Sequence, residues 1–221
     1  MNDMNQNNKK KRNYRIEMER EIESFEKEGR KPALLLHCCC APCSSSVLEQ
    51  LTDHFHVTVF YYNPNISSET EYLKREKELE RLVAEQPALN PVKFSAGPYE
   101  PEKFEEMAAG LENEPERGSR CLRCYRLRLE AAGQEAARIG ADYFTTTLSV
   151  SPLKDADSLN AIGAEVSESC HVPYLFSDFK KKDGHLRSIR LSEEYGLYRQ
   201  DYCGCRFSKN NAASHGRPKH N

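Results

Sequence analysis

The stretch ALLLHCCCAPC at residues 33–43 determines the fold class of this chain. Its apolar start, residues 33–37, is typical of a short strand that is buried on both faces of a parallel sheet. Pro42 suits the first turn of a helix, so we predict a helix over residues 43–51. The cysteines of the stretch therefore lie where a strand passes into a helix.

Strand and helix patterns alternate along the rest of the chain. β-branched and aromatic runs favour strands, while a capping box at Ser68 and Glu71 and prolines in first turns favour helices. The strands are predicted over residues 33–37, 56–62, 92–95, 142–148 and 172–176, and the helices over residues 43–51, 68–85, 102–109 and 121–139. This alternation predicts an α/β fold with a mostly parallel sheet.

Three polar segments directly follow predicted strands, namely His37–Cys43, Asn63–Asn65 and Thr147–Lys154. In open α/β sheets, functional sites lie beyond the carboxyl ends of the strands. We therefore expect these three segments to meet at one edge of the sheet.

The two ends of the chain differ from this pattern. Met18, Ile22 and Phe25 recur at helical spacing, which predicts a helix from Asn13 to Gly29. Residues 1–12 are Asn-rich and then basic, so we expect them to be disordered. From about residue 208 the chain is polar and is predicted to be a tail.

Composition excludes a membrane protein. The chain has 221 residues, a net charge of -2 and a mean hydropathy of -0.78. Its longest apolar run is far too short to span a bilayer, so we expect no membrane partner. The N-terminus lacks the apolar core of a secretory signal. We therefore expect a cytoplasmic protein whose thiols stay reduced.

Nine cysteines occur mostly in short clusters, which indicates metal binding or redox chemistry rather than packing. Side chains of adjacent cysteines are expected to point apart, so the run at 38–40 and 43 is not expected to serve one small metal ion. Cys121 and Cys124 share a helix face, and Cys203-Gly204-Cys205 suits a metal or a strained, reducible disulfide. Cys170 stands alone and is attributed to packing.

The number of clustered cysteines separates the possible cofactors. A [4Fe–4S] cluster takes four cysteines and a tetrahedral zinc takes four ligands, so the clustered cysteines exceed one site. Either one cluster plus a second metal, or one cluster plus a redox disulfide, accounts for nearly all of them. No motif for a nicotinamide or flavin dinucleotide is present.

Arginines surround the C-x-x-C pair. Most are expected to be solvated and to pair with Glu130 or Glu135, whereas Arg128 lies on the cysteine face, where it is placed to contact a cluster or an anionic substrate. Four residues are candidate proton donors, each of which suits a turn or packing role equally well: Tyr125, Asp155, Asp201 and Tyr202.

Five motifs in order resemble one known family. They are LLHCCCAPC (35–43), FYYNPNI (60–66) with E-Y-x-x-R (71–75), RCLRCYRLRL (120–129), FTTTLSVSPLKD (144–155) and YRQDYCGCRFS (198–208). Together they resemble the cobalamin-independent epoxyqueuosine reductases. The resemblance implies a Rossmann-like domain similar to the adenine-nucleotide α-hydrolase (PP-loop) group, with helical additions. It also implies reduction of epoxyqueuosine to queuosine at the wobble position of tRNAs for Asp, Asn, His and Tyr.

The resemblance further implies roles for individual cysteines. Cys39, Cys40, Cys121 and Cys124 match the ligands of a [4Fe–4S] cluster. Cys203 and Cys205 match a pair treated as redox-active, or as ligands of a second mononuclear metal, iron or zinc, for which Cys43 is another candidate ligand. Where the family motif usually reads His-x-Cys-Cys, this chain has Cys38 at x, and no spacing rule requires it.

The expected organisation and partners follow from the sequence pattern, and the resemblance covers only about residues 30–208. We expect a basic, helical extension at residues 1–29, one iron–sulfur catalytic domain at residues 30–208 and a disordered tail at residues 209–221. An external donor such as a ferredoxin or flavodoxin must supply electrons. Candidate phosphate-binding patches are Lys9–Arg12, the Arg120–Arg128 helix, Lys180–Lys182 and Lys209–Lys219.

Two other function classes remain open from the sequence. A zinc-stabilised RNA-binding module without catalysis would explain clustered cysteines and basic patches. An ATP-dependent tRNA-thiolating enzyme of the PP-loop group would need a Gly/Ser-rich pyrophosphate loop after the first strand. Here CCCAPCSSS supplies serines at that place but lacks the glycines.

Overall fold

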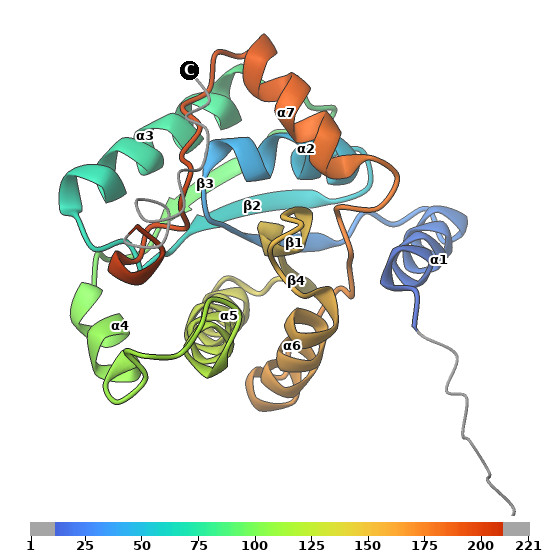
Figure 1. The fold of residues 1–221 in the computed structure, drawn as a ribbon. Coiled ribbons are helices and arrows are strands. Elements are labelled where there is room, and N and C mark those ends of the chain that lie inside the picture. Colours follow the sequence, from blue (N-terminus) through green and yellow to red (C-terminus); the bar gives the residue numbers. More distant parts are fainter. Residues whose placement is uncertain (1–11, 210–221) are drawn as a thin grey trace, which may run out of the picture.

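The computed structural model describes residues 12–209 and contains a four-stranded, all-parallel sheet (Figure 1). Its strands are β1 (Ala33–Cys38), β2 (His56–Tyr61), β3 (Lys93–Ala96) and β4 (Tyr143–Thr146), in the spatial order β3-β2-β1-β4. The predicted α/β fold with a parallel sheet is confirmed. Residues 1–11 and 210–221, which hold most of the predicted disordered ends, lie outside the described residues.

Helices cover both faces of this sheet (Figure 1). On one face lie α2 (Ala41–Leu51), α3 (Glu69–Glu85) and α7 (Gly184–Glu194), and on the other lie α5 (Ser119–Ile139) and α6 (Ala156–Cys170). The remaining helices are α1 (Tyr14–Lys27), α4 (Pro101–Ala108) and a 3-10 turn, η1 (Thr147–Val150). Within residues 12–209, no helix combines the length and the apolar character needed to cross a membrane.

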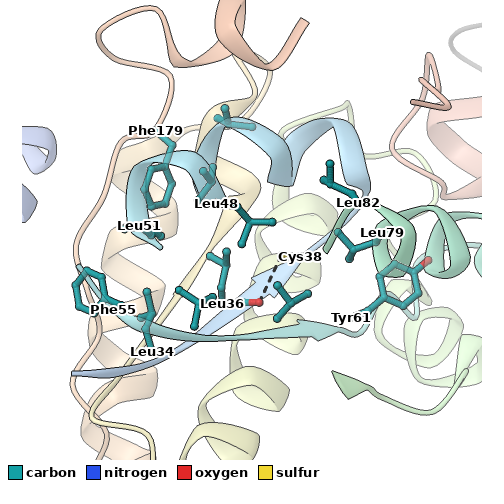
Figure 2. Packing of buried hydrophobic residues seen from close by; sticks show 14 of the residues in the cluster. Leu34, Leu36, Cys38, Leu48, Leu51, Phe55, Tyr61, Leu79, Leu82 and Phe179 are labelled. Carbon is teal, nitrogen blue, oxygen red and sulfur yellow. Dashed lines mark hydrogen bonds between the residues drawn. The ribbon is translucent and has the colours of Figure 1, made fainter. Parts of the chain in front are cut away.

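The central strand β1 explains why the stretch at 33–38 is apolar throughout. Leu34 and Leu36 point to one face, where they pack with Leu48 and Leu51 of α2 (Figure 2). Leu35 points to the opposite face, where it packs among residues of α5 and α6. Since both faces are covered, alternation between apolar and polar residues is not required.

The N-terminal helix α1 follows the predicted helical spacing. Met18, Ile22 and Phe25 are buried and pack in the same cluster as Leu34 and Phe55. The apolar face of α1 is therefore continuous with the core that supports β1.

Two local predictions are wrong. The segment at 172–176 is not a strand of the sheet: it forms one isolated bridge, between Tyr174 and Phe144, and Pro173 within it has no N–H to donate to a ladder. The capping box is absent, because Ser68 makes no side-chain cap hydrogen bond and Glu71 instead pairs with Arg75. Helices α6 and α7 lie in stretches for which no helix was predicted.

Candidate functional site

The three segments that follow strands do meet at the carboxyl edge of the sheet. Asn63, after β2, donates from Nδ2 to the carbonyl of Cys38 at 3.0 Å, and its Oδ1 accepts from Arg128. Thr147, after β4, lies with its Oγ1 3.8 Å from the Sγ of Cys39. Asn65 donates to the carbonyl of Cys203 at 3.1 Å, which joins the C-terminal segment to the same edge.

Three of the cysteines after β1 form a compact sulfur group. The Sγ atoms of Cys39, Cys40 and Cys43 all lie within 4.8 Å of one another, and those of Cys39 and Cys40 are 3.6 Å apart. The expectation that adjacent cysteines diverge is therefore wrong for this pair. Cys40 is the N-cap of α2 in an extended conformation (φ -171°, ψ 161°), and Cys43 lies one helical turn further on the same side.

Cys38 does not join this group. Its side chain is fully buried in the apolar cluster on the α2 side of the sheet, and its Sγ lies 3.5 Å from the carbonyl of Leu36. Burial in these surroundings raises the pKa of the Cys38 thiol. Cys38 is thus a core residue, although it stands next to ligand-like thiols.

The sulfur group readily carries one negative charge but resists more. Hydrogen bonds from Cys40 and Cys43 hold the pKa of Cys39 well below its ordinary value. The same hydrogen bond to Cys39 raises the pKa of Cys40 to about 12, and the pKa of Cys43 is raised well above its ordinary value. Full deprotonation of all three thiols therefore needs a bound cation.

A second set of cysteines lies beside the first. Cys121 and Cys124 open α5, and Cys203 and Cys205 follow α7; all four line one small cavity together with Arg128. None of the cysteines in residues 12–209 forms a disulfide, and the Sγ atoms of Cys203 and Cys205 are 3.5 Å apart.

Cys203 and Cys205 have opposite acid–base properties. Hydrogen bonding with Cys205 and the nearby ammonium of Lys154 lower the pKa of Cys203 well below its ordinary value, and the pKa of Cys205 is raised by the hydrogen bond to Cys203. The Oγ of Ser208 lies 3.0 Å from the Sγ of Cys203. These opposite shifts favour proton loss from Cys203 over Cys205, which suits metal binding or disulfide chemistry.

Hydrogen bonds hold the segment that carries this pair against α3 and the loop that precedes α3. Arg75 donates to the carbonyl of Cys203 at 3.4 Å and to Glu71 at 2.7 Å, and the backbone N–H of Ser67 donates to the carbonyl of Gly204 at 3.2 Å. Arg75 is only 2% exposed. Sequence reasoning gave it no role, although the i, i+4 spacing of Glu71 and Arg75 is a recognisable ion-pair signal.

A cavity of about 160 Å³ lies between the two sets of cysteines. The lining residues closest to the chemistry are Cys39, Cys43, Arg75, Arg128, Lys154 and Cys203. Within the described part of the chain, Nη2 of Arg75 and Nε of Arg128 are buried without a hydrogen-bond partner. Thiols and unpaired cationic donors in one place are the donor set expected around an anionic metal–sulfur group.

The arginine predictions are partly confirmed. Arg126 pairs with Glu130 and Glu165 on the surface, and Arg128 reaches the cysteine region as expected. Arg120 is not solvated: it is 3% exposed, donates to the carbonyl of Leu111 and lies over the ring of Phe207.

The predicted basic patches are largely neutralised by internal ion pairs. Lys180 pairs with Asp178, Lys182 with Glu19 and Arg12 with Glu17. Each of these ion pairs removes a candidate phosphate contact. The patch residues at 9–11 and 210–219 lie outside the described residues.

Several other candidates have structural roles. Asp155 caps α6, where its Oδ2 accepts from the backbone N–H of Ser158 at 2.8 Å, so its carboxylate is already engaged. The thiol of Cys170 packs against Gly133, as expected for a packing residue. His37, for which no separate role was predicted, connects β1 to β4 and to the end of β2.

The imidazole of His37 is fully buried between Thr146 of β4 and the end of β2. Its Nδ1 lies 2.8 Å from Thr146 Oγ1 and its Nε2 lies 3.0 Å from the carbonyl oxygen of Tyr62. Burial lowers the pKa of His37 to about 3, so the ring is neutral at physiological pH. It therefore serves as a cross-link beneath the cysteines rather than as an acid.

Comparison with known proteins agrees with this site. A family described as Epoxyqueuosine reductase QueH matches residues 34–211. A Streptococcus pyogenes protein called Epoxyqueuosine reductase QueH is 41% identical over 203 residues, covering 91% of this chain and 80% of the relative. Proteins with the same description from Staphylococcus epidermidis (42% over 200 residues; 89% and 84%) and Thermotoga maritima (38% over 181 residues; 79% and 89%) are also similar.

The matched region begins at β1 and includes all the cysteines described above. It also includes the five motifs on which the resemblance was based. On the strength of the family match and of relatives near 40% identity, this chain belongs to the epoxyqueuosine reductase QueH family of oxidoreductases.

Proposed function

We propose that this protein reduces epoxyqueuosine to queuosine at the wobble position of tRNAs for Asp, Asn, His and Tyr. The observation that carries the proposal is the convergence of seven cysteines from three segments at two neighbouring cavities, which share Arg128, Lys154 and Cys203, in a chain of this family. They are Cys39, Cys40, Cys43, Cys121, Cys124, Cys203 and Cys205.

The reaction sets clear requirements. An epoxide, two electrons and two protons give an alkene and water, so the chain needs a reductant and a place to receive electrons. No dinucleotide motif is present, which favours an external one-electron donor such as a ferredoxin or flavodoxin. Thiol-ligated iron is the electron-accepting group that clustered cysteines can hold.

The thiols of the two cysteine sets support such a group, and the compact sulfur group of the structure joins Cys39 and Cys40 to Cys43. We assign Cys39, Cys40, Cys121 and Cys124 to a [4Fe–4S] cluster, which would supply electrons one at a time when bound. Cys43, Cys203 and Cys205 then remain for a second metal, iron or zinc, or for a redox pair formed by Cys203 and Cys205. The buried guanidiniums of Arg75 and Arg128 would offset the negative charge of the thiolates.

We propose that the epoxide-bearing ring enters the cavity lined by Cys39, Cys43 and Lys154, while the base stays at the rim. Unpaired bases of an anticodon loop are accessible to such recognition.

We expect tRNA phosphates to be bound by cationic side chains that form no ion pair within the protein. Among residues 12–209, Arg117, Arg123 and Lys181 are exposed and form no ion pair. Binding through these residues would weaken as salt concentration rises. Affinity that does not change with salt would contradict this part of the proposal.

The cofactor assignment is tested on protein purified and reconstituted without oxygen. Iron, zinc and acid-labile sulfide are measured per chain, with Cys170→Ser as the matched control and Cys121→Ser as the test variant. We expect about four iron and four sulfide in wild type and control, and loss of sulfide in Cys121→Ser. Zinc alone, without sulfide, would favour an RNA-binding module instead.

A further inference from the structure

Lys154 has an unusual position at the carboxyl edge. It closes the turn after η1, where its backbone N–H donates to the carbonyl of Ser151 at 3.1 Å. Its side chain borders both the cavity with Cys39 and Cys203 and the smaller cavity with Cys121. The ammonium therefore stands at the junction between the two sets of cysteines.

The ammonium of Lys154 is held without a carboxylate. Its Nζ lies 5.5 Å from the ring centroid of Tyr125, and across residues 12–209 no Asp or Glu forms an ion pair with it. The neighbouring carboxylate, Asp155, is directed to the start of α6 and bonded to Ser158. Lys154 is half-buried, so its ammonium carries a partial desolvation cost that no ion pair within residues 12–209 offsets.

The side chains of Cys121, Cys124, Tyr125 and Cys203 line the smaller cavity together with Lys154. A lysine side chain is ordinarily charged at neutral pH, so Lys154 offers N–H donors to a molecule in the cavity.

The other cations of the cavity are already engaged or closed off. Arg75 is committed to Glu71 and to the carbonyl of Cys203, and Arg128 to Asn63. The nitrogens of Arg75 and Arg128 that lack partners are sealed from solvent. Arg199 donates from Nη1 to the Oγ of Ser192 at 3.1 Å and lines only the larger cavity. Lys154 lines both cavities, so it is the cation best placed to meet a molecule between the two sets of cysteines.

We propose that Lys154 is a catalytic residue: its ammonium donates a hydrogen bond to the epoxide oxygen and stabilises the negative charge that develops there as the carbon–oxygen bond breaks. The inference rests on the proposed reduction of epoxyqueuosine. Preorganised donors aimed at a developing oxyanion give large rate effects in a site that excludes water.

The balance of the step is complete. Two electrons from the external one-electron donor reduce the epoxide, both carbon–oxygen bonds break and a carbon–carbon double bond forms. The oxygen leaves as water with two protons that come ultimately from solvent. Lys154 is an ammonium before and after, so it adds nothing to the net equation.

The test compares Lys154→Met, Lys154→Arg and Lys154→Ala with wild type. The control is Lys93→Met, because Lys93 is exposed at the amino end of β3, away from the carboxyl ends of the strands. Each variant is reconstituted without oxygen and given epoxyqueuosine tRNA and dithionite. We expect kcat to fall about 100- to 1,000-fold in Lys154→Met, with KM changed by less than about threefold. Iron content should equal that of wild type.

Two further readouts separate chemistry from structure. Wild type should bind epoxyqueuosine tRNA about tenfold or more tightly than queuosine tRNA, because a charged donor meets the extra oxygen. Lys154→Met should lose this preference. Ethylammonium should restore part of the activity of Lys154→Ala, and Lys154→Arg should keep more activity than Lys154→Met.

Three results would overturn the inference. They are an unchanged kcat in Lys154→Met, loss of iron in parallel with activity, and an unchanged preference for epoxyqueuosine tRNA. If Lys154→Met does not fold, the test rests on the residual activity of Lys154→Arg and on the rescue of Lys154→Ala by ethylammonium. Absence of both the residual activity and the rescue would overturn the catalytic role of Lys154. If wild type itself does not convert epoxyqueuosine, the proposed function fails instead, which is a distinguishable outcome.

Discussion

Replacing Gly204 by alanine should release the segment that carries Cys203 and Cys205. Gly204 has φ +111°, a conformation that side chains rarely adopt, and strain of this kind is of order 1–3 kcal/mol. An added Cβ would also lie 2.7 Å from Cγ1 of the buried Ile66. Overpacking typically adds about 1–3 kcal/mol, so the docked segment would lose about 2–6 kcal/mol.

The assay is alkylation of Cys205 in the metal-free, reduced protein, read by mass spectrometry of its proteolytic peptide. Cys205 is 7% exposed, so it reacts mainly when the segment opens. Since about 1.4 kcal/mol corresponds to a factor of ten, Gly204→Ala should raise its alkylation rate about 30-fold or more. The peptide of Cys170, on α6, is the internal control and should react as in wild type.

A matched variant separates strain from contact. Gly110 also has a positive φ, +77°, but an added Cβ would meet nothing within 4 Å. Gly110→Ala should therefore cost only about 1–2 kcal/mol and leave alkylation of Cys205 unchanged. Equal alkylation of Cys205 in wild type and Gly204→Ala would refute the conclusion that Gly204 and Ile66 lock this segment in place.

Three other substitutions test separate parts of the site. His37→Gln should weaken the dependence of the free energy of unfolding on pH. The pKa of His37 in the folded protein is lowered to about 3, so the stability that its neutral ring contributes is present above pH 6.5 and is lost as pH falls toward 3. The loss amounts to at most about 1.4 kcal/mol per pH unit. Urea unfolding of metal-free protein between pH 7 and 5 measures this, and an unchanged slope would contradict it. Arg75→Met should destabilise the fold by about 3–5 kcal/mol, because it leaves Glu71 half-paired and removes a bond to the carbonyl of Cys203; a loss under 1 kcal/mol in urea would count against the clamp. Cys39→Ser should lower iron content after reconstitution while Cys170→Ser does not, and equal iron in the two variants would remove Cys39 from the ligand set.

Much of the scaffold was predictable because it depends on local patterns. The apolar run of β1 between two covered faces, the Pro42 start of α2 and the loops after parallel strands all follow from short-range rules. The meeting of the segments after β1, β2 and β4 at one edge is a consequence of parallel topology, so it needed no knowledge of side-chain contacts.

The sulfur geometry was not predictable in the same way. Whether Cys39 and Cys40 converge depends on the extended φ and ψ of Cys40, a backbone choice that sequence spacing leaves open. The position of Cys203 depends on contacts with Asn65 and Arg75, which are more than a hundred residues away in the chain. The segment at 172–176 has strand-like residues, but Pro173 has no N–H to donate to a ladder. The segment therefore forms only one isolated bridge to β4.

Conversion of the substrate is the decisive measurement for the proposed function. Wild-type protein, reconstituted with iron and sulfide without oxygen, is incubated with dithionite and tRNA that contains epoxyqueuosine, and the tRNA is digested to nucleosides for mass spectrometry. We expect epoxyqueuosine to be replaced by queuosine, which is lighter by one oxygen atom. Unchanged epoxyqueuosine, with full iron and sulfide bound and the tRNA shown to bind, would contradict the proposed reduction.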